Sequence, residues 1–421
     1  MKKVLLFHVP LLLSLLINVH YDVLPQTNFV WGRQFGSEKE EAGLNAVADQ
    51  VGNVYVAGST QGNLSGSNYG KADGFLTKLD STGAILWTKQ FGTKEDDNIN
   101  WLTIDNLGNI YLTGATGGVV TQSYGSTDIW VVTFDSSGNL KWQQQYGSDS
   151  VDVGNGIYVD EKRDIYISGV TKGCIGKTSF GKTDGVLLKL DTAGNKIFAV
   201  QFGTPENDDC LGVSGDATSV IYVCGNTSGD LACKNKGKWD AFVGLFSTHG
   251  EQIRFIQFGT DNYDNASHTV VDKKGNLYIG GSTGGDFAGK NQGEGDCLLI
   301  KMNKNGEIVW SHQFGTEKWD GILGIDMNEK ISDNIVVSGC QHWPDCQSFV
   351  RMFTKDGDLL WTRNSVAAGK FGGTCGKGVC FDRKGNVYHT GLTGGNLFNS
   401  VAGEHDIFVV KYEMEKKSIQ P

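Results

Sequence analysis

Six acidic residues recur at one fixed position along the chain, and they form the first pattern whose residue types suit chemistry. Each lies five residues after the glycine of a Gln-Phe-Gly or Gln-Tyr-Gly motif. The series consists of Glu41, Asp97, Asp152, Asp208, Asp264 and Asp320. Carboxylates that lie close together disfavour one another's ionisation unless a cation compensates, and calcium is a natural partner for such oxygens. The spacing therefore predicts a shared calcium site.

The same series has a structural alternative, and a second recurrent acidic series shares it. The second series consists of Asp73, Asp128, Asp184, Asp240, Asp296 and Asp406. An aspartate at the start of a strand commonly accepts hydrogen bonds from nearby backbone N–H groups and so fixes a turn. A residue that is repeated in every unit builds the unit more often than it serves one site. We therefore favour the turn role over the calcium site.

Three tryptophans interrupt the repeated pattern instead of following it. Trp239 precedes Asp240, Trp319 precedes Asp320, and Trp343 lies in a short loop of the sixth unit. Exposed aromatic side chains on a rigid loop surface suit contacts with sugars or proteins. These tryptophans are therefore the predicted ligand-binding residues, with packing inside the loops as the alternative. Two further tryptophans, Trp101 and Trp130, are expected to pack between sheets.

Sequence signatures of catalysis are missing from the chain. The histidines show no His-x-x-x-His spacing, and there is no Gly-x-Ser-x-Gly elbow around a nucleophilic serine. The formal net charge is −10 without a basic stripe, which argues against nucleic acid as a partner. The predicted catalytic set is therefore empty, and the sequence favours a binding or structural protein over an enzyme.

The elements that position these residues follow from an internal repeat. The motif Gln-Phe-Gly or Gln-Tyr-Gly begins at residues 34, 90, 145, 201, 257 and 313, in steps of 55 or 56 residues. A period this regular indicates one supersecondary unit that is copied many times. In the first unit, strands are predicted over residues 44–49, 54–60, 73–80 and 84–91, separated by turns rich in glycine, asparagine and serine. Four antiparallel strands per unit are typical of a β-propeller blade.

The two ends of the repeat predict how the propeller closes. Residues 406–411 match a third strand, and no fourth strand follows them. Residues 29–35 match a fourth strand and precede the first complete unit. The N-terminal strand would therefore complete the last blade and remove an open edge. The sequence thus predicts an all-β, seven-bladed β-propeller over residues 28–413, followed by a C-terminal tail over residues 414–421, and the first acidic series would ring the mouth of its axial channel.

The repeat resembles a known family. Trp-x-x-Gln-Phe-Gly, the Asp-x-x-Gly-Asn-x-Tyr turn, Gly-Ser-Thr and Asp-Gly-Phe-Leu-Thr-Lys-Leu-Asp are similar to the motifs of SBBP-type β-propeller repeats. The similarity covers nearly all of residues 28–413, while the sixth and seventh units depart from it. The resemblance implies secretion or surface display far better than it implies an activity.

The N-terminus and the cysteines also predict an extracellular protein. Lys2 and Lys3 precede an apolar run over residues 4–19, which is the layout of a signal peptide, here assigned to residues 1–21. This run is too short for a comfortable membrane span. Nine cysteines leave at least one thiol unpaired within the chain. At least one disulfide is expected among Cys340, Cys346, Cys375 and Cys380, and glycosylation sequons begin at Asn63, Asn226 and Asn265.

Together these patterns predict a secreted, non-enzymatic propeller that binds a protein, glycan or mineral ligand outside the cell. An extracellular matrix, including a mineralised one, is a setting that suits an acidic secreted disc. The alternative is a secreted glycan hydrolase or lyase with its site over the propeller channel. An enzyme would need converging acid and base groups that are not repeated, whereas the acidic groups here are mostly repeated.

Overall fold

The fold is all-β, as the repeat predicted. The computed structural model describes residues 29–216, 219–329, 331–367 and 373–413, which form twenty-eight strands and no helix. The predicted signal peptide and the C-terminal tail lie outside these residues. Within the described ranges there is accordingly no long apolar helix that could cross a membrane.

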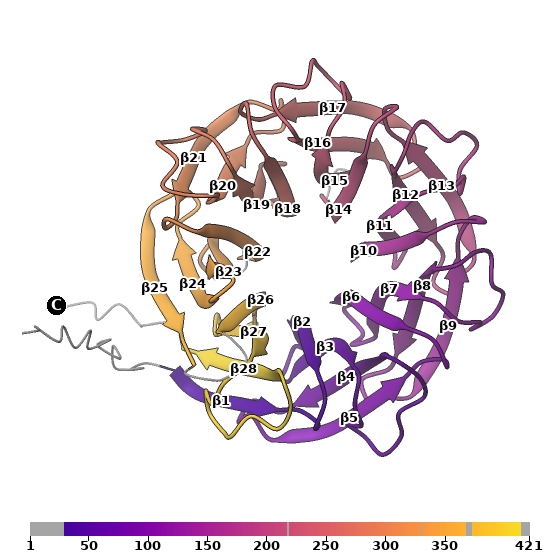
Figure 1. Ribbon diagram of the computed structural model, residues 1–421, viewed down its shortest axis with the longest axis vertical. Coiled ribbons are helices and arrows are strands. Elements are labelled where there is room, and N and C mark those ends of the chain that lie inside the picture. Colours follow the sequence, from indigo (N-terminus) through magenta and orange to yellow (C-terminus); the bar gives the residue numbers. More distant parts are fainter. Residues whose placement is uncertain (1–28, 217–218, 330, 368–372, 414–421) are drawn as a thin grey trace, which may run out of the picture.

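Seven antiparallel four-stranded sheets form the blades of a propeller (Figure 1). Blades 1 to 3 contain β2 (Glu41–Ala48), β3 (Val54–Thr60), β4 (Asp73–Leu79) and β5 (Ile85–Phe91); β6 (Asp97–Ile104), β7 (Ile110–Thr116), β8 (Asp128–Phe134) and β9 (Leu140–Tyr146); and β10 (Asp152–Val159), β11 (Ile165–Thr171), β12 (Asp184–Leu190) and β13 (Lys196–Phe202). Blades 4 and 5 contain β14 (Asp208–Gly215), β15 (Val220–Thr227), β16 (Asp240–Ser247) and β17 (Gln252–Phe258); and β18 (Asp264–Val271), β19 (Leu277–Thr283), β20 (Asp296–Met302) and β21 (Ile308–Phe314). Blades 6 and 7 contain β22 (Trp319–Asn328), β23 (Asn334–Trp343), β24 (Gln347–Phe353) and β25 (Leu359–Ser365); and β26 (Thr374–Phe381), β27 (Val387–Thr393), β28 (Asp406–Tyr412) and β1 (Phe29–Phe35).

The last blade closes the ring as predicted. In Figure 1, β1 lies beside β28 at the outer edge of blade 7. The two strands pair antiparallel, with Gly32 opposite Val410 and Phe35 opposite Ile407. β1 also reaches blade 1, because the indole N–H of Trp31 donates to the carbonyl of Ser81 at 2.9 Å. One strand therefore joins the end of the chain to its beginning.

The Gln-Phe-Gly motif recurs because each of its residues has a separate structural role. In blade 1, the amide Nε2 of Gln90 donates to Oδ2 of Asp73 at 2.7 Å, and its Oε1 accepts from the backbone N–H of Leu64 at 2.9 Å. The glutamine thereby pins the loop that joins the second and third strands. Phe91 packs on Trp130 of the next blade, with ring centroids 5.3 Å apart.

The glycine of the motif fits where no larger residue would. A β-carbon placed on Gly92 would lie 2.6 Å from Oδ1 of Asp73 and 2.9 Å from Oδ2 of Asp97. Real β-carbons do not approach other heavy atoms that closely, so only glycine can cross this pair of carboxylates. The two acidic series therefore meet at the junction between consecutive blades.

The innermost strands are the ones that surround the axis. Figure 1 shows β2, β6, β10, β14, β18, β22 and β26 nearest the centre. Each carries a β-bulge at the same position, such as the one between Ile99 and Trp101. Small residues allow neighbouring strands to approach, since a β-carbon on Gly378 would lie 2.5 Å from the Cα atom of Asn45.

The innermost strand of blade 1 starts earlier than the sequence predicted. It begins at Glu41 instead of residue 44, because the acidic residue itself pairs with the preceding blade. The backbone N–H of Glu41 donates to the carbonyl of His405 at 3.1 Å, and Asp97 repeats the arrangement with Ala72 at 2.9 Å. These bonds link the first strand of each blade to the blade before it.

Candidate functional site

The first acidic series lies inside the protein, at the junctions between blades. Its six members are each at most 1% exposed: Glu41, Asp97, Asp152, Asp208, Asp264 and Asp320. Asp208 is an example of the series. Its Oδ2 accepts from the backbone N–H of Thr204 at 2.6 Å and from the hydroxyl of the same residue at 2.9 Å. Thr227 of the adjacent strand donates to the other oxygen. These carboxylates therefore fix their own loops, which is the arrangement of the turn alternative.

The second acidic series faces the first across each junction. Asp184 accepts from Gln201 at 2.7 Å through Oδ2, while its Oδ1 is buried and has no hydrogen-bond partner. Burial raises the pKa of Asp208, and the negative charge of Asp184 raises it further. Burial is also the largest cause of the raised pKa values of the equivalent residues Glu41, Asp97, Asp264 and Asp320.

This arrangement differs from the predicted ring at the mouth of the channel. The carboxylates point toward the glycine of the preceding motif and toward the neighbouring blade, because loop hydrogen bonds orient them there. Each of the six junctions that carry these residues holds one carboxylate pair, whereas the predicted site needed several carboxylates in a common space. A calcium site made of the first series stays a prediction.

The three predicted ligand-binding tryptophans lie on one face of the propeller. We call this the loop face; it carries the loops between second and third strands, such as residues 228–239, and the loops between blades, such as residues 259–263. Trp319 and Trp343 are paired across β22 and β23. Trp343 is 54% exposed, whereas Trp319 is half-buried against the backbone of Gly321 and Gly295. The structure thus brings these two tryptophans together and leaves the ring of Trp343 in solvent.

Trp239 lies at the preceding junction, beside an aromatic residue that the sequence analysis did not single out. The backbone of Trp239 bridges to Tyr263, which is 53% exposed. The ammonium group of Lys238 lies 4.5 Å from the centre of the Tyr263 ring. The repeat contains a signal for Tyr263, because an aromatic residue stands where blades 2, 3 and 4 carry the non-aromatic residues Asp96, Val151 and Asn207.

An open polar cleft lies between the loops that carry Trp239 and Tyr263, although neither of these two side chains lines it. It has a volume of about 690 Å³. Three loops line it: the two that carry these aromatic side chains and the loop that follows β19. Lys236, Asp261 and Asn291 supply a positive charge, a negative charge and an amide to its lining. The loop face over blades 4 to 6 therefore combines exposed aromatic rings with a polar cleft.

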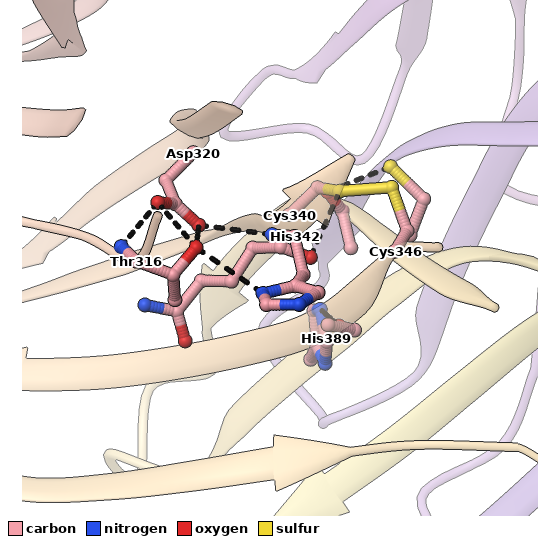
Figure 2. The surroundings of a disulfide bond; sticks show 10 residues. Thr316, Asp320, Cys340, His342, Cys346 and His389 are labelled. Atoms are coloured by element: carbon pink, nitrogen blue, oxygen red, sulfur yellow. Dashed lines mark hydrogen bonds between the residues drawn. A yellow bond between two sulfur atoms is a disulfide. The ribbon is translucent and has the colours of Figure 1, made fainter. Parts of the chain in front are cut away.

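A disulfide holds the loop that presents Trp343. Cys340 and Cys346 are bonded, which confirms the expected disulfide in this region. Figure 2 shows a second attachment, in which the backbone N–H of His342 donates to Oδ1 of Asp320 at 2.9 Å. Asp320 thus differs from Asp208, whose Oδ1 accepts from a threonine on the second strand of its own blade. The ring of His342 also contacts the hydroxyl of Thr316 at 3.3 Å. These contacts and the pairing of Trp343 with Trp319 fix residues 341–345, which are the end of β23 and the turn after it and which we call the Trp343 loop.

A second cavity lies on the propeller axis and opens toward the opposite, turn-bearing face. It has a volume of about 320 Å³ and is lined by the C-terminal halves of the innermost strands, including Asn45, Tyr158 and Asp326. Trp101 and His268 stack there, with ring centroids 3.9 Å apart and an angle of 17° between the ring planes. Because they belong to blades 2 and 5, their stack crosses the axis.

The two tryptophans expected to pack between sheets therefore differ. Trp130 is fully buried and contacts Phe91 of the adjacent blade, as predicted. Trp101 also touches the core between blades 2 and 3, but its ring stacks on His268 across the axis. The β-bulge beside Trp101 lies at the position that faces the axis, which explains why its indole reaches the opposite blade.

Two ionisable groups in the axial cavity have shifted pKa values. Removal from bulk water, together with the positive charge of Lys377, lowers the pKa of His268 to about 3. Burial raises the pKa of Asp326 to about 6, although the N–H groups of Phe381 and Met327 donate to it at 2.8 Å. His268 is therefore a neutral imidazole at neutral pH. Sequence reasoning missed both groups, because no local motif marks them.

The comparisons with known proteins agree with this architecture. The family model for the SBBP β-propeller repeat matches residues 86–119 and 253–288. These segments fall in blades 1 to 2 and blades 4 to 5, so the chain carries β-propeller repeats of the SBBP type, as the motifs indicated.

A curated relative shares part of the sequence. The regulatory protein FlaEY of Caulobacter vibrioides is 24% identical over 165 residues, which are 35% of this chain and 17% of FlaEY. The chain therefore matches less than a fifth of the length of that relative.

A solved structure shares the fold at low sequence identity. A polysaccharide lyase of family PL25, an ulvan lyase bound to -[GlcA(1-4)Rha3S]-, is 14% identical with a TM-score of 0.52, and the match covers 90% of this chain and 95% of the lyase. A protein from Dyadobacter fermentans is 10% identical with a TM-score of 0.49, over 93% of this chain and all of that chain.

Proposed function

We propose that this protein is a secreted, non-enzymatic carbohydrate-binding propeller whose ligand lies on the loop face over blades 4 to 6. The observation that carries the proposal is the exposure of Trp343 and Tyr263, each more than half exposed, on the same face as the open polar cleft. Both aromatic residues depart from the repeat. They are therefore available for recognition, whereas the repeated residues build the blades.

The chemistry of this surface suits sugars. Aromatic rings pack against the apolar faces of pyranose rings, and their N–H or O–H groups also form hydrogen bonds. Lys236, Asp261 and Asn291 offer charged and amide groups for hydroxyl recognition in the cleft. The disulfide and the His342–Asp320 hydrogen bond hold Trp343 in place before binding. A loop that is already ordered loses less conformational entropy when the ligand arrives.

The extracellular setting is part of the proposal. It is supported by the apolar run after Lys2 and Lys3 and by the SBBP-type repeats. An extracellular matrix, including a mineralised one, suits an acidic disc whose ligand is a matrix polysaccharide. The polysaccharide lyase with the same fold makes oligosaccharides the first ligands to test.

The test is oligosaccharide binding by the mature protein, measured by calorimetry over a panel of neutral and acidic glycans. The proposal expects that Trp343→Ala and Tyr263→Ala each weaken binding by about fivefold, since a stacking contact contributes roughly 1 kcal/mol. Val51→Ala and Leu107→Ala are matched controls, because these exposed side chains lie in turns on the opposite face. Equal losses for all four variants, or no binding to any glycan, would reject the proposal.

A second candidate function is a glycan lyase or hydrolase at the axial cavity. The observation that favours it is the presence of neutral His268 and of Tyr158 in the same cavity, since both side chain types act as proton acceptors or donors in catalysis. It expects new reducing or unsaturated chain ends from a polysaccharide, and a loss of that activity in His268→Ala. Binding without cleavage, unchanged in His268→Ala, favours the first function.

A further inference from the structure

The junction between blades 6 and 7 is chemically unlike the other six. At this junction Gln347 and Thr374 stand where the other junctions carry two carboxylates. The backbone link is kept, since the N–H of Thr374 donates to the carbonyl of Cys346 at 2.7 Å. Three cysteines lie beside it. A cluster of sulfur atoms therefore lies at the one junction that lacks the carboxylate pair.

The cluster contains one sulfur atom more than its disulfide needs. The Sγ atoms of Cys340, Cys346 and Cys375 all lie within 4.8 Å of one another, and each residue is at most 4% exposed. Cys340 and Cys346 are bonded, and Cys375 is a free thiol. Leu323 and Leu392 pack around the three residues. The third sulfur thus lies beside the bridge, in an apolar environment that excludes external thiols.

We propose that Cys375 is a resolving thiol that moves the bridge from Cys340–Cys346 to Cys346–Cys375, and that this exchange removes the covalent closure of the Trp343 loop. The thiolate of Cys375 attacks Sγ of Cys346, the bond between the two original sulfurs breaks, and Cys340 leaves as a thiolate that takes up the proton lost by Cys375. One disulfide is present before and after the step. The exchange therefore needs no oxidant or reductant.

The two bridges constrain different parts of the molecule. The bridge between Cys340 and Cys346 closes the Trp343 loop within blade 6, because the two residues flank it. A bridge between Cys346 and Cys375 instead joins the start of β24 to β26 of blade 7, alongside the existing backbone link. The loop then keeps the His342–Asp320 hydrogen bond, the contact of the His342 ring with Thr316 and the pairing of Trp343 with Trp319, but it loses its covalent closure. The junction gains a covalent link at the place where it lacks carboxylates.

Burial sets the rate of the exchange. It raises the pKa of Cys375, and the positive charge of Lys377 opposes this in part. The attacking species is the thiolate, which is scarce at neutral pH when the pKa is raised. The exchange is therefore slow at neutral pH and faster in mildly alkaline solution.

The first experiment uses the intact mature protein. The folded protein is incubated in mildly alkaline buffer without thiol reagents, quenched with acid, denatured, alkylated and mapped by mass spectrometry under non-reducing conditions. The expected result is a peptide pair joined through Cys346 and Cys375, with alkylated Cys340 in the same proportion. A single bridge between Cys340 and Cys346, with Cys375 fully alkylated at every time point, would overturn the proposal.

The second experiment traps the alternative bridge. Cys340→Ser is secreted or refolded in a glutathione redox buffer, which supplies the oxidant that this variant needs. We expect it to contain the Cys346–Cys375 bridge and to show faster hydrogen exchange at the amide of His342. Cys380→Ser is the matched control, because Cys380 is buried on the same strand outside the cluster. Two results would contradict the proposal: a free Cys346 thiol in folded Cys340→Ser, or unchanged hydrogen exchange at the His342 amide once the new bridge is present. If this variant does not fold, the disulfide mapping of the intact protein decides.

Discussion

Single carboxylates at the blade junctions control how stability depends on pH. Asp208 has a raised pKa in the folded protein because it is buried and faces Asp184. A carboxyl group with a raised pKa binds its proton more tightly in the folded state than in the unfolded state. Its contribution to stability is therefore largest at acidic pH, and it is lost as the pH rises from the ordinary aspartate value of 3.8 through the raised value.

Asp184→Asn tests this relation at one junction. The amide keeps an oxygen for the hydrogen bonds from Gln201 and Phe180, and its NH₂ group replaces the oxygen that has no partner. We expect the variant to be more stable than the wild type near pH 7 by about 1 kcal/mol, which is the typical value of one gained hydrogen bond. The loss of stability as the pH rises above 3.8 should also be smaller, because Asp208 no longer faces a charge.

Urea unfolding at several pH values measures both effects, and an exposed turn residue gives a control of opposite sign. Hydrogen bonds from Asn195 lower the pKa of Asp191. Its stabilising effect is present above its ordinary pKa and is lost as the pH falls, so Asp191→Asn should be less stable than the wild type near neutral pH. A lower stability of Asp184→Asn at neutral pH would contradict the account of the junction.

At the scale of the element, the repeated Phe-Gly loop and the first strand after it form one unit that hydrogen bonds hold together. Each loop donates its own backbone N–H and hydroxyl groups to the acidic residue, as Thr260 does to Asp264 at 2.6 and 2.9 Å. We therefore expect no change in melting temperature between millimolar calcium and chelator at constant ionic strength. A rise in calcium would revive the shared-cation prediction, because a ligand that binds only the folded state stabilises it.

The sequence predicts elements of this kind well and their side-chain contacts less well. The motif of Gln90, Phe91 and Gly92 indicates a blade, because each of these residues makes a structural contact that recurs with the motif. The direction of the Asp97 carboxylate depends on a neighbouring loop and on Asp73 of the preceding blade. The spacing of the residues in the sequence does not report these contacts, and the prediction therefore placed the carboxylate at the channel mouth. In blade 6, the replacement of Gly by Val366 marked the exceptional junction. Only the structure shows which of the cysteines near it are in contact.

At the scale of the whole molecule, ring closure creates contacts that no local pattern reports. Trp101 and His268 belong to separate blades, and they stack only because seven blades bring their innermost strands around one axis. The same closure was predictable at the two ends, since residues 29–35 carry a fourth-strand motif and the last unit lacks one. A missing strand can be recognised from a repeat, whereas a contact across the axis cannot.

The closing strand gives the prediction for the whole propeller. β1 pairs along β28, whose residues are all buried, and Gln34 donates to Asp406 at 3.0 Å in the same way as the glutamines of blades 1 to 5. A mature chain that begins at residue 36 lacks β1 and exposes the edge of β28. We expect it to lose at least about 3 kcal/mol of stability, the usual cost of deleting one buried tryptophan such as Trp31, and to aggregate through the open edge.

Thermal unfolding of this chain should be compared with that of a chain that begins at residue 22 and keeps β1. Addition of a peptide covering residues 28–35 should restore part of the lost stability. Equal melting temperatures for the two chains would show that the ring does not depend on its N-terminal strand.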